Sequence, residues 1–122
     1  MNLGELEKKI MEHIWKQKNG SFTVREITTD LEQKGDSYAY NTILTVMTHL
    51  YEKKLLSRKK KGKHCVYSVK MNKSTYVGYS SRAIFEKMQK EFGAIAIAHF
   101  ADLVENIDPT ILAEAKKKLE KK

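Results

Sequence analysis

Cysteine and long apolar runs are scarce in this sequence, and each scarcity excludes certain kinds of site or certain classes of protein. Cys65 is the only cysteine, so neither an intrachain disulfide nor a cysteine-cluster zinc site can form, which fits a reducing cytoplasm. The longest apolar run, Ala94 to Ala98, is far shorter than the roughly 20 residues of a membrane helix. The first residues also lack the apolar stretch of a signal peptide. We therefore expect a soluble, cytoplasmic protein without membrane insertion.

Patterns that would indicate catalysis or metal binding are missing as well. The histidines His13, His49, His64 and His99 are scattered, and none lies in a ligand pattern such as H-E-x-x-H. The sequence has no glycine-rich phosphate loop and no nucleophile paired with a plausible base. We therefore predict no enzymatic activity, no metal site and no cofactor.

Acidic residues are absent from positions 53 to 85, where basic residues are frequent. That segment carries +10 while the whole chain carries +8, so the remaining residues sum to −2. Such a concentrated positive charge usually faces a phosphate backbone. The alternative is a solvated, lysine-rich surface without a partner. The ten basic side chains are Lys53, Lys54, Arg58, Lys59, Lys60, Lys61, Lys63, Lys70, Lys73 and Arg82.

Apolar residues at helical spacing predict three helices in the first half of the chain. The first helix covers about residues 3–17 and stops near Asn19-Gly20, and the second begins at a capping box of Thr23 and Glu26 and ends near Gly35. The third begins near Ala39. The predicted inward-facing residues are Leu3, Leu6, Ile10, Met11, Ile14 and Trp15, then Val24, Ile27 and Leu31, then Ile43, Val46, Met47 and Leu50.

The opposite face of the third helix is polar but nearly uncharged. It carries Asn41, Thr42, Thr45, Thr48 and His49, whereas a solvent face would more often carry lysine and glutamate. Threonine methyls can touch thymine methyls, and asparagine can pair with adenine. This face therefore suits contact with base edges, and the alternative is a mildly polar face exposed to solvent.

Two short β runs, residues 55–59 and 64–69, flank a basic loop and predict a hairpin. Alternation places Cys65, Tyr67 and Val69 inward, which favours Cys65 as a small core residue over the alternative of a redox sensor. Three helices followed by a hairpin make a mainly α winged helix-turn-helix in residues 1–72. Its recognition helix, about residues 39–53, would lie in the major groove, with the basic wing, residues 58–64, on phosphates.

Residues 73–122 are again helical. One apolar stripe, which Gly93 interrupts, consists of Val77, Ile84, Phe85, Met88 and Phe92. The following segment, residues 94–98, is apolar on all sides, and Asp108-Pro109 begins a final helix. These helices bury too little alone, so we predict a dimerisation region and a homodimer. The alternative is a monomer in which they pack back on the winged domain. The predicted dimerisation residues are Tyr76, Ile84, Met88, Phe92, Ile95 and Leu112.

Four stretches in order carry a family resemblance: residues 3–15, 23–27 and 39–50, and Gly62-Lys63 with Tyr67. Together they resemble the penicillinase and methicillin-resistance repressors of BlaI/MecI type, a family that also includes copper-responsive repressors. The resemblance implies a dimeric transcriptional repressor bound to double-stranded operator DNA with inverted-repeat symmetry. By position, Asn41, Thr42 and Thr45 would face bases, and Arg25, Lys53, Lys60, Lys61 and Lys63 would meet phosphates.

The chain departs from the family pattern at three places. Antibiotic-responsive members are cleaved at a C-terminal Asn-Phe bond through a membrane sensor protease pathway, and the matching pair here is His99-Phe100. Copper-responsive members use C-terminal cysteine pairs, which this chain lacks. Lys54 stands where the family usually has glycine at the turn after the recognition helix, and a left-handed lysine costs about 1 kcal/mol.

A second function class would share the same charge. A basic RNA-binding or architectural protein would bind nucleic acid without sequence specificity. RNA readers usually expose aromatic side chains for stacking, whereas Tyr67 lies on the inward side of the predicted hairpin. The sequence therefore favours duplex DNA.

Overall fold

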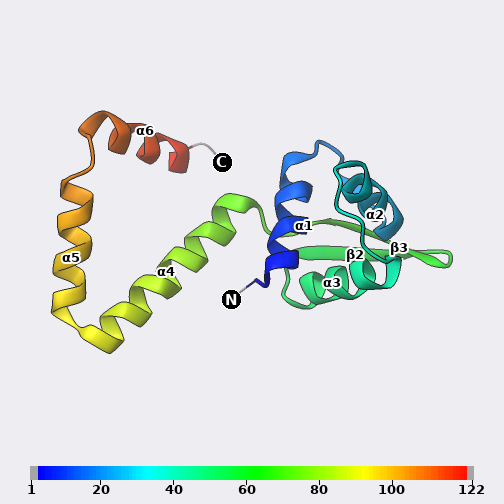
Figure 1. Ribbon diagram of the computed structural model, residues 1–122, viewed down its shortest axis with the longest axis horizontal. Coiled ribbons are helices and arrows are strands. Elements are labelled where there is room, and N and C mark those ends of the chain that lie inside the picture. Colours follow the sequence, from blue (N-terminus) through cyan, green and yellow to red (C-terminus); the bar gives the residue numbers. More distant parts are fainter. Residues whose placement is uncertain (1–2, 121–122) are drawn as a thin grey trace. The chain divides into compact units, whose positions relative to one another are not determined.

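The computed structural model describes residues 3–120 and divides into two compact units, the first ending at Tyr76 and the second beginning at Val77 (Figure 1). The first unit contains α1 (Glu5–Lys16), β1 (Ser21–Phe22), α2 (Val24–Gln33), α3 (Tyr40–Glu52), β2 (Leu56–Lys61) and β3 (His64–Val69). The strands form one antiparallel sheet in the order β1-β3-β2. This arrangement is a winged helix-turn-helix, which confirms the predicted fold class.

The ends of α2 follow the local sequence. Thr23 Oγ1 accepts from the Glu26 backbone N–H at 3.1 Å, and Glu26 Oε1 accepts from the Thr23 N–H at 2.9 Å, which confirms the capping box. At the other end, Gly35 has φ of 92° and its N–H donates to the Glu32 carbonyl. The next N–H, of Asp36, donates to the Leu31 carbonyl, completing a Schellman motif in which glycine takes the left-handed position.

Lys54 takes the same left-handed position after α3, with φ of 67°. The N–H groups of Lys54 and Leu55 donate to the carbonyls of Tyr51 and Leu50, so α3 also ends in a Schellman motif. Leu50 and Leu55 are both fully buried. Because the burial of both leucines and both hydrogen bonds depend on the turn, the fold tolerates a strained lysine where glycine would be relaxed.

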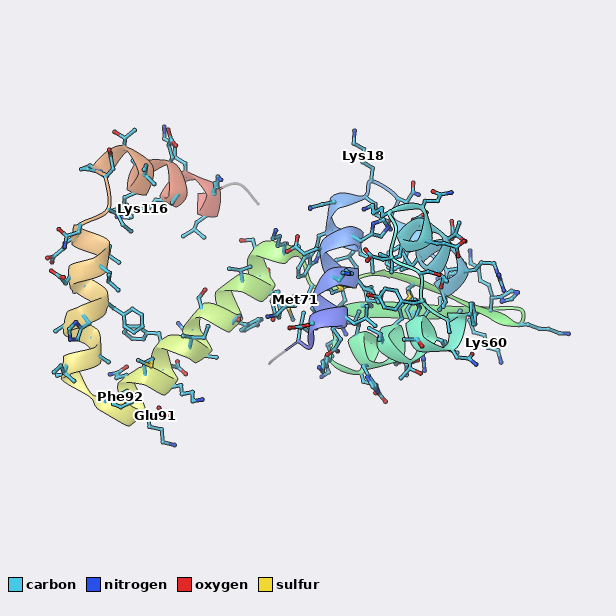
Figure 2. The ribbon with its side chains drawn as sticks, viewed as in Figure 1. Lys18, Lys60, Met71, Glu91, Phe92 and Lys116 are labelled. Atoms are coloured by element: carbon cyan, nitrogen blue, oxygen red, sulfur yellow. The ribbon has the colours of Figure 1, made fainter. Side chains whose placement is uncertain are left out.

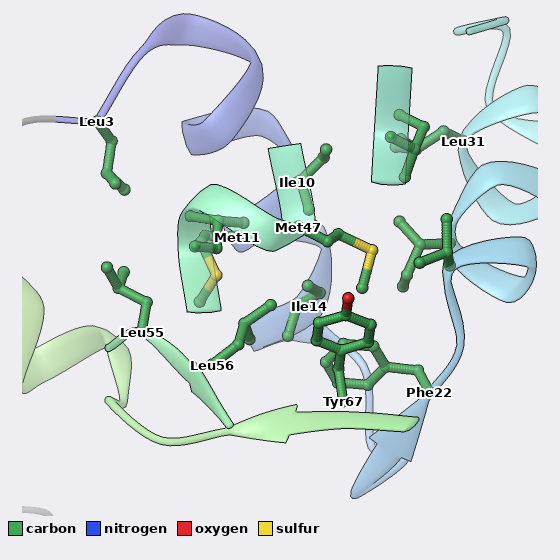
Figure 3. Close-up of a cluster of buried hydrophobic side chains, with 14 of the residues drawn as sticks. Leu3, Ile10, Met11, Ile14, Phe22, Leu31, Met47, Leu55, Leu56 and Tyr67 are labelled. Carbon is green, nitrogen blue, oxygen red and sulfur yellow. The ribbon is translucent and has the colours of Figure 1, made fainter. Parts of the chain in front are cut away.

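One hydrophobic core holds the first unit together, with α1, α2 and α3 packed over one side of the sheet (Figure 3). The predicted apolar stripes of all three helices point into it. Tyr67, in the central strand, is fully buried, and Cys65 is partly buried against the core as predicted. The core residues are Leu3, Ile10, Met11, Ile14, Phe22, Val24, Ile27, Leu31, Ile43, Met47, Leu50, Leu55, Leu56, Tyr67 and Tyr76.

Two features of the sheet differ from the sequence prediction. The strand β1 was not predicted, although Phe22 directly precedes the N-cap Thr23 and is buried together with Ile27, as in a hydrophobic staple. The inward orientation of Val69 was wrong, because this side chain is 39% exposed. Val69 ends β3, and β1 reaches only as far as Ser21 opposite Ser68, so the sheet has narrowed to two strands there.

The second unit continues α4 (Lys73–Phe92) and adds α5 (Ala94–Glu105) and α6 (Pro109–Glu120). Gly93, with φ of 66°, separates α4 from α5 as predicted. Asp108 Oδ1 accepts from the Thr110 N–H at 2.7 Å, so it caps the helix that begins at Pro109. Over residues 3–120, no helix combines the length and the apolar character that crossing a membrane requires.

Candidate nucleic-acid interface

The outer face of α3 is the first part of the candidate interface. Ile43, Met47 and Leu50 point inward and are fully buried, which leaves the predicted base-contacting residues Asn41, Thr42 and Thr45 exposed on the other side. Helical geometry makes residues 41, 44, 45 and 48 neighbours on that surface. An uncharged strip therefore runs along the recognition helix.

The threonine hydroxyls on this strip are already engaged within the helix. Thr45 Oγ1 donates to the Asn41 carbonyl at 2.9 Å, and Thr48 Oγ1 donates to the Leu44 carbonyl at 2.8 Å. A hydroxyl has a single proton to donate. Toward an external partner these side chains therefore offer an acceptor lone pair and a methyl group, and the amide of Asn41 is the strip's versatile hydrogen-bonding group.

The wing is the hairpin of β2 and β3, which projects beyond the helices of the first unit (Figure 1). Lys61 pairs with His64 across a two-residue turn of Gly62 and Lys63, and Gly62 has the positive φ of 62° that such turns need. Lys60 lies opposite Cys65, on the sheet face that carries the buried Tyr67. Because side chains alternate along a strand, Lys61 lies on the other face.

The recognition helix and the wing meet at a cleft of about 340 Å³. Residues from the start of α2, from α3 and from the wing line it: Thr23, Val24, Arg25, Tyr40, Leu44, Lys63, His64, Cys65 and Tyr67. The Arg25 guanidinium lies over the Tyr40 ring at 5.2 Å from its centroid. The tertiary fold thus brings Arg25 and Lys63, far apart in sequence, to one opening beside the uncharged strip.

The ion pairs of the first unit leave the wing cations uncompensated. Lys9 pairs with Asp36, His13 with Asp30, Lys53 with Glu7 and Lys73 with Glu12. Within residues 3–120, no carboxylate lies at ion-pair distance from the wing lysines at positions 59, 60, 61 and 63. Within the acid-free segment, Lys53 and Lys73 therefore pair with carboxylates of α1, whereas the wing lysines do not.

Lys53 differs from the other predicted phosphate ligands, because its ammonium binds inside the protein. Lys53 Nζ donates to Glu7 Oε1 at 2.9 Å, and the Gly4 N–H donates to the same oxygen. Burial raises the pKa of Glu7, but the hydrogen bonds from Lys53 and Gly4 and the electrostatic effect of Lys53 and His49 outweigh it, so the pKa is lowered. This pair ties the end of α3 to the start of α1.

Three residues at this interface escaped the sequence prediction. Leu44 lies in the uncharged strip and is 36% exposed, although a leucine in an apolar stretch suggests the core. Tyr40 and Tyr51 each lie under an arginine, and the Arg58 guanidinium is 4.0 Å from the Tyr51 centroid. The spacing of positions 40, 44 and 51 marks one side of the helix, but only the tertiary fold shows that arginines of α2 and β2 reach it.

The predicted dimerisation residues lie in different environments. Tyr76 is buried in the core of the first unit, where its ring packs on Trp15 with centroids 5.7 Å apart. In the second unit Ile84, Phe92 and Ile95 are 59%, 58% and 65% exposed, while Met88 and Leu112 are half-buried. The proposed cleavage pair His99-Phe100 lies inside α5, and Phe100 packs on Phe85.

The fold and this charge distribution define a DNA-binding winged-helix protein. The chain belongs to the penicillinase repressor family, whose model matches residues 3–121. This is the BlaI/MecI family of transcriptional repressors, so the predicted family and the absence of enzymatic function are confirmed.

Solved structures of winged-helix regulators are similar to this chain. The DNA-binding domain of the repressor BlaI is 28% identical, with a TM-score of 0.52, and the match covers 62% of this chain and 88% of that one. BlaI of Bacillus licheniformis in complex with the blaP half-operator is 26% identical, with coverages of 62% and 89% and a TM-score of 0.48.

A more distant similarity shows the fold alone. The ferric uptake regulator from Pseudomonas aeruginosa with manganese is 17% identical, with a TM-score of 0.53, over 58% of this chain. The match spans 54% of that regulator, little more than half of its length. No curated protein matches this chain.

Proposed function

We propose that the protein is a cytoplasmic, dimeric transcriptional repressor that binds inverted-repeat operator DNA through α3 and the wing. The observation that carries this proposal is the cleft where α3 and the wing meet, between an uncharged helix face and unpaired cations. Base edges carry sequence information, whereas phosphates position the protein. Here these two tasks fall on adjacent surfaces of one compact unit.

In the proposed complex, the strip around Asn41, Thr42 and Thr45 lies in the major groove. Arg25, Lys60, Lys61 and Lys63 contact phosphates on either side of it. Lys60 and Lys61 lie on opposite faces of the wing, so they would reach different phosphates. Lys53 donates to Glu7, and we propose that it combines this structural role with a phosphate contact at the end of α3.

Exposed apolar side chains of the second unit support a homodimer. Large hydrophobic residues that are exposed concentrate there, including Ile84, Phe92 and Ile95, and the apolar segment of α5 buries only Ala96. A patch of this kind usually marks a protein interface. Two-fold pairing through these helices would present two copies of α3 to the two halves of a symmetric operator.

Derepression by cleavage at the His99-Phe100 bond remains a prediction, and it requires that the helix around this bond unfold first. The bond lies within the helical part of α5, whereas proteases act on extended chain. A sensor-linked protease would therefore need local unfolding of α5 before cleavage.

Fluorescence anisotropy with duplex DNA from the protein's own upstream region tests the proposal. We expect tight binding to this DNA, much weaker binding to random duplex and a steep loss of affinity with salt. Equal affinity for both duplexes would refute sequence-specific repression. Competition with RNA of the same sequence addresses the architectural or RNA-binding alternative, because RNA that competes as well as duplex DNA would support that alternative.

A further inference from the structure

Leu44 occupies an unusual place on the recognition helix. It is 36% exposed, while Ile43 and Met47 of the same helix are fully buried. Its helical neighbours on the surface are Asn41, Thr45 and Thr48. A single exposed leucine needs no explanation on an ordinary surface. This one, however, lies at the centre of the face proposed to read bases.

The surrounding threonines strengthen the apolar character of this position. Their hydroxyl protons are donated to the Asn41 and Leu44 carbonyls of the same helix. Neither threonine therefore has a proton left for a base acceptor, and each still carries a methyl group. Leu44, Thr45 and Thr48 together form a methyl patch on α3.

The cleft places cations beside this patch. Leu44 lines the cleft together with Arg25, Lys63 and His64. A phosphate backbone held by Arg25 and Lys63 would bring the edge of a base pair against Leu44. In the major groove, the apolar group that a base pair presents is the C5-methyl group of thymine.

We infer that Leu44 is a specificity-determining residue that recognises a thymine C5-methyl group in each operator half-site. This inference rests on the proposed function and deepens it, because it names the base and the chemical group that the methyl patch reads. Recognition occurs by apolar contact rather than by hydrogen bonding. The discriminating atom is therefore a single carbon of the DNA.

Replacement of thymine by deoxyuridine removes that carbon alone and leaves the Watson–Crick and groove hydrogen-bonding groups in place. The preferred operator is first selected from a pool of random duplexes with the wild-type protein. Each thymine of one half-site is then replaced in turn, and the dissociation constant is measured for the wild type and for Leu44→Ala. We expect one replacement to weaken wild-type binding about fourfold, the value for one buried methyl group.

Leu44→Ala should bind the thymine and deoxyuridine duplexes at that position about equally, since the contact is already lost. Leu44→Gln keeps the side-chain length and helix propensity and should also lose the discrimination. Val69→Ala is the matched control, because Val69 is a similarly exposed aliphatic residue that lies outside the basic segment 58–64, at the end of β3 farthest from the hairpin turn. It should retain the fourfold preference for thymine.

Two different failures can be told apart. If the wild type selects no sequence, sequence-specific repression fails and the inference fails with it. If an operator is selected but Leu44→Ala keeps the full penalty for deoxyuridine, the proposed function stands and Leu44 does not read the methyl group. A deoxyuridine scan without any effect on the wild type would likewise overturn the inference alone.

Discussion

Replacement of a wing lysine should change the salt dependence of DNA binding by a predictable amount. Lys61 lies at the end of β2, beside the hairpin turn, and no carboxylate among the described residues pairs with it. Lys61→Ala therefore removes a cation without exposing an unpaired acid. The variant should fold like the wild type, because the side chain is exposed.

The magnitude follows from counterion release. Each neutralised phosphate contributes about 0.9 to the slope of log K against log salt, so Arg25, Lys53, Lys60, Lys61 and Lys63 of two subunits give about −9. Lys61→Ala removes one contact per subunit and should make the slope shallower by about 1.8 in the proposed dimer. Between 50 and 200 mM salt, the wild type should lose about twelvefold more affinity than the variant.

Fluorescence anisotropy titrations at four salt concentrations measure this slope for operator and random duplexes. Lys18→Ala is the matched control, because Lys18 is an exposed lysine on the turn before β1, away from the wing lysine Lys60 (Figure 2). Thr45→Ala should instead lose discrimination at particular base pairs and keep the wild-type slope. Indistinguishable behaviour of Lys61→Ala and Thr45→Ala would refute the division of labour between wing and helix.

Three further predictions concern stability and assembly. Glu7→Gln should lower the free energy of unfolding by about 1–2 kcal/mol at pH 7, a modest value because Lys53 is 35% exposed. The folded pKa of Glu7 is below its ordinary 4.5, so the difference in the free energy of unfolding between the wild type and Glu7→Gln should persist above pH 4.5. This difference should disappear as the pH falls through the folded pKa. Urea titrations that show the same difference at every pH would contradict this expectation. Lys54→Gly should stabilise the fold by roughly 0.5–1 kcal/mol, because it removes the backbone strain of a lysine in the left-handed conformation. A lower melting temperature for this variant would show that the lysine is not strained. Phe92→Asp should give monomers in sedimentation velocity, whereas Phe92→Leu should remain dimeric; an intact Phe92→Asp dimer would exclude this side chain from the interface.

Local sequence signals predicted the helices well because the interactions that define them span only a few residues. The Thr23–Glu26 capping box and the Gly35 turn join groups three to five positions apart, and the structure contains both. The prediction from alternation that Val69 is buried was wrong, because the burial of this side chain depends on how far the neighbouring strand β1 extends. The same dependence on distant partners explains why β1 itself was missed.

The sequence by itself determined a winged helix-turn-helix with a basic wing, because periodicity, capping residues and charge are written along the chain. The tertiary structure decided which cations are free, since Glu7 reaches Lys53 and Glu12 reaches Lys73 from far along the chain. It also decided that Tyr76 belongs to the core of the first unit. Finally, it placed Leu44 beside Arg25 and Lys63, which no local pattern could do, because packing alone sets which distant side chains meet.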